Sequence, residues 1–261
     1  MTDINAFGHL ADDYADHRPG YPSEILDTLR EFVASGRIHG DYIVDVAAGT
    51  GISTRLLAKA FGRDYHVVGI EPCLPMLQKA MRPPKEDCDT TYLAAVAEDL
   101  PFRDKSACLV SIAQALHWFD RPRFYAESAR ILEAGGCLAI MQNNRDWENS
   151  AFLNAYESFL ETHIDQYSRY YRSFDILEEL INLNGFQTAE PIFQAWERQM
   201  SLTDFIGLCF SSTKIQKIIR KFGRQKTDKM LRNLVKQYFT PREAIPVGYR
   251  AELYMARRFP N

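Results

Sequence analysis

Two acidic residues and two glycines occupy positions from which they could hold a nucleoside. Asp45 lies at the end of a short apolar, β-branched run, and the turn Asp45-Val-Ala-Ala-Gly49-Thr-Gly51 begins there. Glu71 stands twenty-two residues beyond Gly49, after a second apolar run. Glycines in such a turn let the backbone approach a ligand, and a carboxylate after the next strand can accept both ribose hydroxyls. The other interpretation is a tight turn beside a solvated acidic residue.

The same turn argues against two common nucleotide sites. A dinucleotide fingerprint reads G-x-G-x-x-G, whereas the sequence from Gly49 reads G-T-G-I-S-T, with Thr54 in place of the third glycine. No Gly-Lys-Ser/Thr follows, which excludes a P-loop. Asp45 would repel a pyrophosphate, because like charges close together are unfavourable, and it fits a ligand that carries an ammonium group.

Alternating apolar runs and helical patterns would place these residues on a parallel sheet. Strands are expected at 42–47, 65–70, 91–96, 107–113 and 137–142, with helices at 52–61, through 76–80 up to Pro83-Pro84, and at 122–133 before Gly135-Gly136. Strands that are apolar on both faces, separated by helices of roughly ten to fifteen residues, indicate a sheet covered on both sides. Ligands bind such a sheet beyond the carboxyl ends of its strands, where Asp45 and Glu71 stand.

The second half of the chain is richer in helix. We expect an aromatic-rich helical stretch at 150–171, a helix at 174–183, a strand at 192–200, a helix starting at Ser201, a basic helix at 213–237 and a last strand at 248–257. The fold class is therefore α/β, a doubly wound Rossmann-like fold with a seven-stranded, mostly parallel sheet and helical insertions forming a lid. We expect a single domain, in which residues 1–142 form the ligand-binding core with an N-terminal cap helix and 143–261 complete the sheet and the lid.

Composition excludes several classes of protein. Lys and Arg number 31 against 34 Asp and Glu, so the formal net charge is −3, unlike the basic domain of a general nucleic-acid binder. The five cysteines are odd in number and never spaced as CxxC, so neither a metal site nor a disulfide framework is predicted. No signal peptide and no apolar run of membrane-spanning length is present. We expect a cytoplasmic protein with reduced thiols, without a nucleic-acid or membrane partner, and leave its oligomeric state open.

Four segments in unbroken order resemble one enzyme family. They read VDVAAGTGISTRLLA, VVGIEPCLPMLQKA, AEDLPFRDKSACLVSIAQALHWFD and ESARILEAGGCLAIM. Together with the N-terminal segment, residues 7–142 resemble the class I S-adenosylmethionine-dependent methyltransferases, in particular a small-molecule branch that includes trans-aconitate-type enzymes. The resemblance implies S-adenosyl-L-methionine as the cofactor and methyl transfer to a small metabolite, through a carboxylate or a hydroxyl.

The resemblance also implies a set of cofactor-binding residues that follow the strands or lie in the N-terminal segment. They are Tyr14, Arg18, Asp45, Ala47, Gly49, Gly51, Glu71, Pro72, Met76, Glu98, Asp99, Leu100 and Gln114. Residues 45–51 would line the methionine portion, with Ala47 replacing a glycine common there. Glu71 would bind the ribose, and residues 72, 76 and 98–100 would surround the adenine. Gln114 would lie near the sulfonium, and Arg18 would bind the cofactor carboxylate, since guanidinium binds carboxylates bidentately.

Catalytic and acceptor-binding roles are expected for a second set. His117, Gln114 and Tyr14 are the candidate catalytic residues, with His117 as general base for a hydroxyl acceptor. The alternative for His117 is a structural histidine beside a packed Trp118. The expected acceptor pocket consists of His117, Trp118, Arg145, Trp147 and Arg172, with the stretch 147–171 as its lid. The arginines, Arg169 included, would meet an acidic acceptor, whereas the basic run 213–229 is interpreted as a solvated helix face.

Two further functions remain open. The chain could be a catalytically inactive cofactor-binding partner subunit, or it could methylate RNA or protein. Base-methylating enzymes carry an [N/D]-P-P-[Y/F/W] motif after the fourth strand, where this sequence reads QALHW from Gln114.

Overall fold

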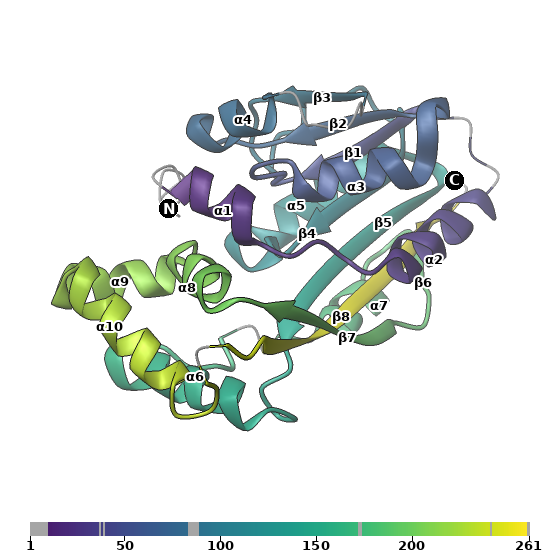
Figure 1. The fold of residues 1–261 in the computed structure, drawn as a ribbon. Coiled ribbons are helices and arrows are strands. Elements are labelled where there is room, and N and C mark those ends of the chain that lie inside the picture. The colour runs from purple at the N-terminus through teal and green to yellow at the C-terminus, as the bar shows by residue number, and fades with distance from the viewer. Residues whose placement is uncertain are drawn as a thin grey trace.

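The computed structural model describes residues 10–36, 38, 40–82, 89–171, 174–240 and 242–259, and Figure 1 shows their fold. The strands are β1 (Tyr42–Val46), β2 (His66–Ile70), β3 (Thr90–Leu93), β4 (Ala107–Ala113), β5 (Leu132–Arg145), β6 (Phe186–Thr188), β7 (Ile192–Met200) and β8 (Ile245–Arg258). The α-helices are α1 (Ala11–His17), α2 (Ser23–Ala34), α3 (Ile52–Phe61), α4 (Leu74–Ala80), α5 (Arg121–Ile131), α6 (Ala151–His163), α7 (Ile176–Ile181), α8 (Leu202–Phe210), α9 (Thr213–Phe222) and α10 (Arg224–Val235).

The strands form one sheet in the order β3-β2-β1-β4-β5-β8, with β6 and β7 both paired to β8. The pairs among β1 to β5 are parallel, and β8 runs antiparallel to its neighbours. Three residues lie between Thr188 and Ile192, whereas two lie between their partners Ala256 and Leu253. One extra residue therefore divides an edge strand in two at Pro191. The described sheet thus has eight strands instead of the expected seven, because this edge strand is divided, while the expected doubly wound, mostly parallel fold is confirmed.

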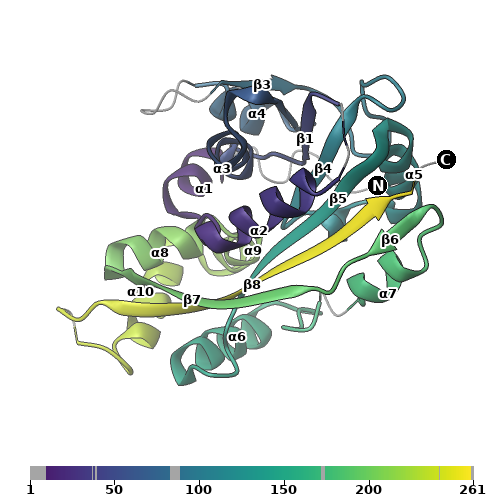
Figure 2. The ribbon, with the colours of Figure 1, turned by 90° about the vertical axis from the view of Figure 1, so that its right-hand side faces the viewer.

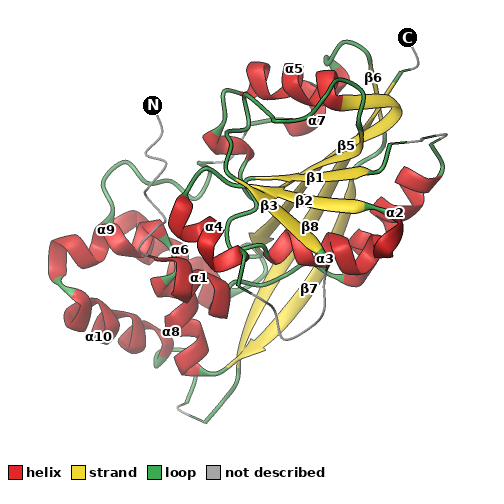
Figure 3. Cartoon of the chain, turned by 90° about the horizontal axis from the view of Figure 1, so that it is seen from above, coloured by secondary structure: helices red, strands yellow, loops and turns green. Residues whose placement is uncertain are grey.

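Helices cover both faces of the sheet because alternate strand residues point to opposite sides. Ile43 packs with α2 and α3, whereas its neighbour Val44 packs with α5 and α7. Figure 3 shows the strands between these two helical layers. Both faces are apolar, which is typical of a parallel sheet and leaves the strand ends as the place for polar chemistry.

A further hydrophobic core, separate from those on the two faces of the sheet, lies in the four helices α6, α8, α9 and α10, which we call the lid. Phe152 and Tyr156 of α6 pack with Phe205 of α8 and Ile215 of α9 in this core. Figure 1 shows these helices gathered at one end of the molecule. In Figure 2, β7 and the yellow β8 run side by side from the sheet to the lid. The lid is therefore joined to the sheet through strand pairing.

Several element boundaries differ from those expected from the sequence. Gly223, with φ of 83°, divides the expected helix 213–237 into α9 and α10. The helix expected to stop at Gly135-Gly136 ends earlier, at Ile131, because β5 already begins at Leu132 and contains both glycines. The helical stretch 150–171 ends at His163. Helix 52–61 and strands 107–113 and 192–200 match their expected bounds, whereas Pro83-Pro84 lies outside the described residues.

The turn between β1 and α3 is built around a buried carboxylate. Asp45 is fully buried, and its Oδ2 accepts hydrogen bonds from Ser53 Oγ at 2.6 Å and Thr54 Oγ1 at 2.7 Å. Thr54, which replaces the third glycine of a dinucleotide fingerprint, thus anchors the first turn of α3. Burial raises the pKa of Asp45 to about 6, although the two hydroxyls lower it in part. Ala47 has a φ of 57°, in the left-handed region that favours glycine.

Replacing Ala47 with glycine is expected to stabilise the protein. The left-handed conformation costs an L-residue about 1–2 kcal/mol, and glycine avoids this cost. Glycine also makes the unfolded chain more flexible, which offsets about 0.5–1 kcal/mol of the gain. Ala47→Gly should therefore raise the free energy of unfolding by about 0.5–1 kcal/mol. Ala58→Gly, within α3, is the control of opposite sign and should lower it by about 1 kcal/mol. Urea unfolding measures the free energy of unfolding of both variants. A lower value for Ala47→Gly than for the wild type would contradict the inference that Ala47 is strained.

The buried carboxyl of Asp45 makes stability depend on pH. Because its folded pKa is raised, folding favours the protonated form, and the stabilisation present below about pH 4 is lost as pH rises through about 6. Asp45→Asn keeps an oxygen for Ser53 and Thr54 but cannot ionise. Between pH 4 and 7 the wild type should lose on the order of 3 kcal/mol relative to this variant, measured by urea unfolding. If the stability of the wild type and of Asp45→Asn changed equally with pH, the raised pKa of Asp45 would be refuted.

Candidate functional site

A cavity of about 1570 Å³ lies at the carboxyl ends of the parallel strands. Its walls come from the segments that follow β1, β2, β3, β4 and β5, from α1, and from the lid. The lining includes most of the residues expected at the site, namely Tyr14, Arg18, Ala47, Gly49, Glu71, Pro72, Met76, Glu98, Gln114, His117, Trp118, Arg145 and Trp147. The fold therefore brings together side chains from both halves of the chain.

Glu71 holds two strand ends together and still has capacity for a ligand. Its Oε2 accepts from the amide of Gly49 at 2.9 Å, and its Oε1 accepts from the amide of Cys73 at 2.8 Å. Burial raises the pKa of Glu71, and these two amides lower it in part. Each carboxylate oxygen has a second lone pair, so two hydroxyls of a ribose can still donate to it. Because the Gly49 amide already binds a carboxylate, the turn offers negative charge and repels a pyrophosphate.

The side of the cavity expected for adenine is lined by Pro72, Met76 and Glu98. Glu98 Oε1 accepts from the amide of Asp120 at 2.9 Å, which ties the loop after β3 to the loop after β4. Asp99 and Leu100 were expected here as well, but neither lines the cavity. A tight turn explains this, because the amide of Asp99 binds the carbonyl of Val96, and Leu100 is buried in the sheet's core.

Two expected contacts of the β1–α3 turn also lie behind the cavity wall. Asp45 is buried beneath the turn, and Gly51 does not line the cavity. A Cβ on Gly51 would approach the hydroxyl of Tyr92, so Gly51 is needed for packing against β3. A Cβ on Gly49, by contrast, would meet nothing within 4 Å. Gly49 and Ala47 thus face open space, whereas Asp45 and Gly51 shape the turn from behind.

Gln114 directly follows β4 and lies on the cavity wall with a strained backbone. Its φ of 62° is in the left-handed region, as is that of Ala47 at the end of the neighbouring strand β1. Its amide donates to the carbonyl of Met141 on β5 at 3.0 Å, so sheet pairing holds it in place. Non-glycine residues in this region concentrate at functional sites, where the surrounding structure enforces the strain.

The N-terminal segment contributes Arg18 and Tyr14 to the cavity. The Arg18 guanidinium lies 4.8 Å from the Tyr14 ring centroid and donates through Nε to Ser211 Oγ at 2.9 Å. Within the described ranges, no carboxylate forms an ion pair with Arg18. Its remaining N–H groups can therefore receive a ligand carboxylate.

The region after β4 brings aromatic rings to the cavity. His117 and Trp118 belong to the 3-10 turn Leu116–Trp118, and their rings lie 4.9 Å apart. His117 also makes an edge contact with Tyr171, with ring centroids 5.6 Å apart. Trp147, after β5, contacts Tyr170 in the same way at 5.6 Å. The segment 164–171 thus reaches from the lid to the strand ends.

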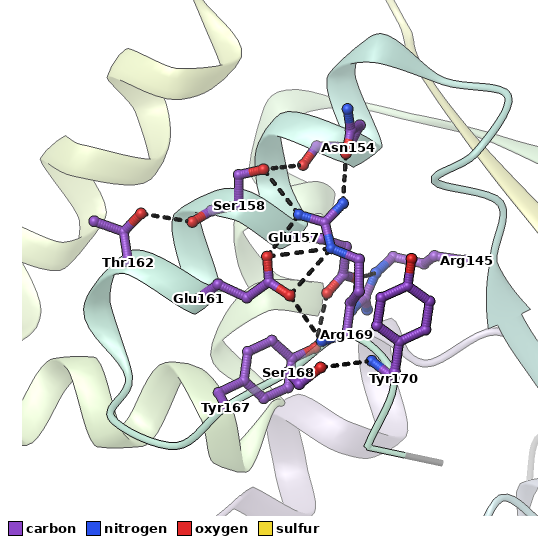
Figure 4. A network of polar contacts seen from close by, with 10 residues as sticks. All are labelled: Arg145, Asn154, Glu157, Ser158, Glu161, Thr162, Tyr167, Ser168, Arg169 and Tyr170. Atoms are coloured by element: carbon purple, nitrogen blue, oxygen red, sulfur yellow. Dashed lines mark hydrogen bonds and ion pairs between the residues drawn. The ribbon is translucent and has the colours of Figure 1, made fainter. Parts of the chain in front are cut away.

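The arginines expected to meet an acidic acceptor are largely engaged within the lid, as Figure 4 shows. Arg145 lines the cavity, but its Nη2 lies 2.6 Å from Glu157 Oε1, and Tyr167 donates to Glu157 Oε2 at 2.7 Å. Burial alone would raise the pKa of Glu157, but Arg145 and the Tyr167 hydroxyl lower it below its ordinary value. Arg169 is similarly paired with Glu161 at 2.7 Å. Arg172 lies outside the described residues.

Lysines on α9 complete the cavity wall and were not expected there. Lys214, Lys217 and Arg220 line the cavity, whereas Ile215 and Ile218 are buried in the lid's core. Lys217 and Arg220 are exposed as well, as the interpretation of this run as a solvated face expects, so this row of residues both meets solvent and lines the cavity. Their spacing of three, which places them on one side of a helix, was the signal available in the sequence.

Other kinds of site have less support within the described ranges. No three His, Cys, Asp or Glu residues there converge as metal ligands, and no helix there is long and apolar enough to cross a bilayer. Cys73, Cys108, Cys137 and Cys209 are buried and form no disulfide. Cys88 lies outside the described residues.

Comparisons with known proteins give a consistent result. Residues 44–140 match the family described as "Methyltransferase domain". The chain is 28% identical over 242 residues to a Dictyostelium discoideum protein named as a methyltransferase, covering 90% of this chain and 86% of that protein. It is 36% identical over 144 residues to an uncharacterised methyltransferase of Mycobacterium bovis, covering 54% of this chain and 53% of that one. The second match therefore spans about half of each protein.

The fold has solved counterparts. A structure from Anaeromyxobacter dehalogenans, named as a type II methyltransferase, superimposes with a TM-score of 0.68 at 24% identity, covering 94% of this chain and 99% of that chain. This likeness concerns the fold, and the matched domain places the carboxyl ends of β1, β2 and β4 around the cavity described above. Residues 44–140 therefore carry a methyltransferase domain, and the matches together support an S-adenosylmethionine-dependent methyltransferase.

Proposed function

We propose that this methyltransferase acts on a small molecule that is enclosed between the strand ends and the lid. One observation carries the proposal: a single cavity extends from Glu71, at the end of β2, to Tyr171 and Lys214 on the lid side. Cofactor and acceptor can then bind next to each other in one compartment. A carboxylate or hydroxyl metabolite, as in the trans-aconitate-type enzymes that the sequence resembles, is the acceptor class we expect.

Binding of the cofactor is assigned to the edge formed by β1, β2 and the N-terminal segment. S-adenosylmethionine supplies a methyl group on a positively charged sulfur. Glu71 accepts the ribose hydroxyls, Gly49 lets the backbone lie close to the ligand, and Arg18 binds the carboxylate. Gln114, fixed by the sheet in its strained conformation, borders the reacting centre. Alignment of this kind can contribute roughly 7–11 kcal/mol to a bimolecular reaction.

His117 is the proposed general base for a hydroxyl acceptor. It lines the cavity one turn beyond Gln114, and its ring is held between Trp118 and Tyr171. A neutral imidazole can take the hydroxyl proton as the oxygen acquires the methyl group. A carboxylate acceptor is already ionised and would need His117 only for positioning.

The two alternatives fit the geometry less well. A nucleic acid or protein substrate needs an open approach to the reacting centre, whereas α6, α9 and the segment 164–171 contribute to the walls here. An inactive partner subunit would need no acceptor compartment next to the cofactor edge.

Glu71→Ala is expected to weaken binding of S-adenosylmethionine about ten-fold to a hundred-fold, because charge-assisted hydrogen bonds contribute about 1.5–3 kcal/mol. Isothermal titration measures the affinity, and thermal unfolding verifies that the variant is folded. Glu190→Ala is the matched control, since Glu190 is exposed and does not line the cavity. Unchanged affinity in a folded Glu71→Ala protein would remove Glu71 from the site.

Incubation with methyl-labelled S-adenosylmethionine and a fractionated metabolite extract tests the function itself. Label should enter small molecules and not RNA or protein. With a hydroxyl acceptor, His117→Gln should lower kcat by about 10²–10⁴-fold, while His66→Gln, an exposed histidine at the start of β2, leaves it unchanged. Label in macromolecules would support the nucleic-acid or protein alternative, and no transfer at all would support the inactive subunit.

A further inference from the structure

Two aromatic rings that line the cavity leave much of their surface uncovered. Trp118, after β4, and Tyr171, in the lid segment 164–171, are each 39% exposed although both line the cavity. His117 contacts both rings, so the three form one aromatic wall that joins the strand ends to the lid. Large exposed rings within a cavity are characteristic of a ligand-binding surface, since solvent contact with them is unfavourable.

Positive charge borders this aromatic wall. Lys214 Nζ lies 3.8 Å from the Tyr171 ring centroid, and Lys217 and Arg220 extend the same side of α9 along the cavity. Arg145 and Arg169 are paired with Glu157 and Glu161 and add little net charge.

Carboxylates on the lid side of the cavity do not cancel this charge. Burial acts to raise the pKa of Glu157, but Arg145 and, more weakly, Lys214 lower it below its ordinary value, so the charge of Glu157 is balanced chiefly by Arg145. Asp146 and Glu148 line the cavity beside Trp147, whereas Asp165 lies next to α9 in a hollow lined by Lys217, Arg220 and Lys221. Among the described residues that line this hollow, Asp165 is the one carboxylate beside three cations, so the side of the cavity formed by α9 is positive.

We propose that the acceptor is a flat, conjugated anion. Its plane packs on Trp118 and Tyr171, and its negative group lies toward Lys214 and Lys217. This inference rests on the proposed function, because it describes the acceptor of the same cavity.

Other acceptor classes match the wall less well. A saturated anion would meet Lys214 but leave the two rings in poor contact. A neutral flat molecule would cover the rings without compensating the charge of α9. A cation would gain from the aromatic faces but would be repelled by Lys214, whose ammonium lies over one face of Tyr171.

Three probes of matched size separate these possibilities. They are 2-naphthoate, which is flat and anionic, naphthalene-2-carboxamide, which is flat and neutral, and decalin-2-carboxylate, which is anionic and saturated. Isothermal titration into protein saturated with S-adenosylhomocysteine should show 2-naphthoate binding at least ten-fold more tightly than either of the others. Equal affinity for the naphthoate and either comparison probe would overturn the proposal.

Two variants then assign the preferences to residues. Lys214→Met should remove the preference for naphthoate over the carboxamide while keeping the preference over decalin carboxylate. Tyr171→Leu should remove the preference for naphthoate over decalin carboxylate while keeping the preference over the carboxamide. Lys229→Met, an exposed lysine of α10 outside the cavity lining, should change neither. Unchanged affinity for S-adenosylhomocysteine shows that each variant is folded, and an unchanged preference in both variants would refute the assignment.

The probe-binding experiment and the methyl-transfer experiment test separate proposals, and either can fail without the other. If the probes bind with the stated preferences but no small molecule is methylated, the proposed function falls and the description of the cavity stands. If small molecules are methylated but the probes show no preference, the acceptor class is wrong and the proposed function stands.

Discussion

The carboxylate of Glu71 is the interaction on which the arrangement of this cavity depends. It binds the amide of the β1–α3 turn and the amide that begins α4, and so fixes the ends of two neighbouring strands relative to each other. It also determines the sign of charge in the turn. Glu71 Oε2 accepts from the Gly49 amide, which a phosphate would otherwise use. The negative charge of Glu71 at this place favours a positively charged nucleoside over a phosphate. Asp45, buried behind the same turn, strengthens this preference from beneath without touching the ligand space.

The cofactor half of the molecule could be predicted from the sequence largely because its signals are local. An apolar strand, a glycine turn and an acidic residue after the next strand determine where Glu71 and Gly49 lie. Local reasoning failed where a side chain's direction depends on a turn. Asp99 lies next to Glu98, yet the turn from Val96 leaves only Glu98 on the cavity wall. Asp45 and Gly51 show the same limit, because the spacing of residues along the sequence does not reveal which of them lie behind the turn.

The lid half was harder to predict because its partners are distant in the chain. Nothing in the sequence indicates that Arg145 meets Glu157, and the spacing of the cations on α9 shows only that they share one side of the helix, not that this side lines the cavity. The charge balance of the acceptor side results from these pairings. Two arginines that seemed suited to an anion are neutralised, while lysines that resembled a solvent-facing run line the wall. Net charge counted along the chain could not show this.

The pairing of β7 with β8 carries the lid on two strands whose other ends belong to the sheet. The lid has its own hydrophobic core, separate from the two cores that flank the sheet. Substitutions on α9 and α10 can therefore reshape the proposed acceptor side of the cavity while the ends of β1 and β2 keep their geometry. Ser211 must be kept, because it holds the Arg18 guanidinium at the proposed cofactor edge. The part of the β7–β8 hairpin beyond Ser211 is thus the natural place to redesign what receives the methyl group without altering what donates it.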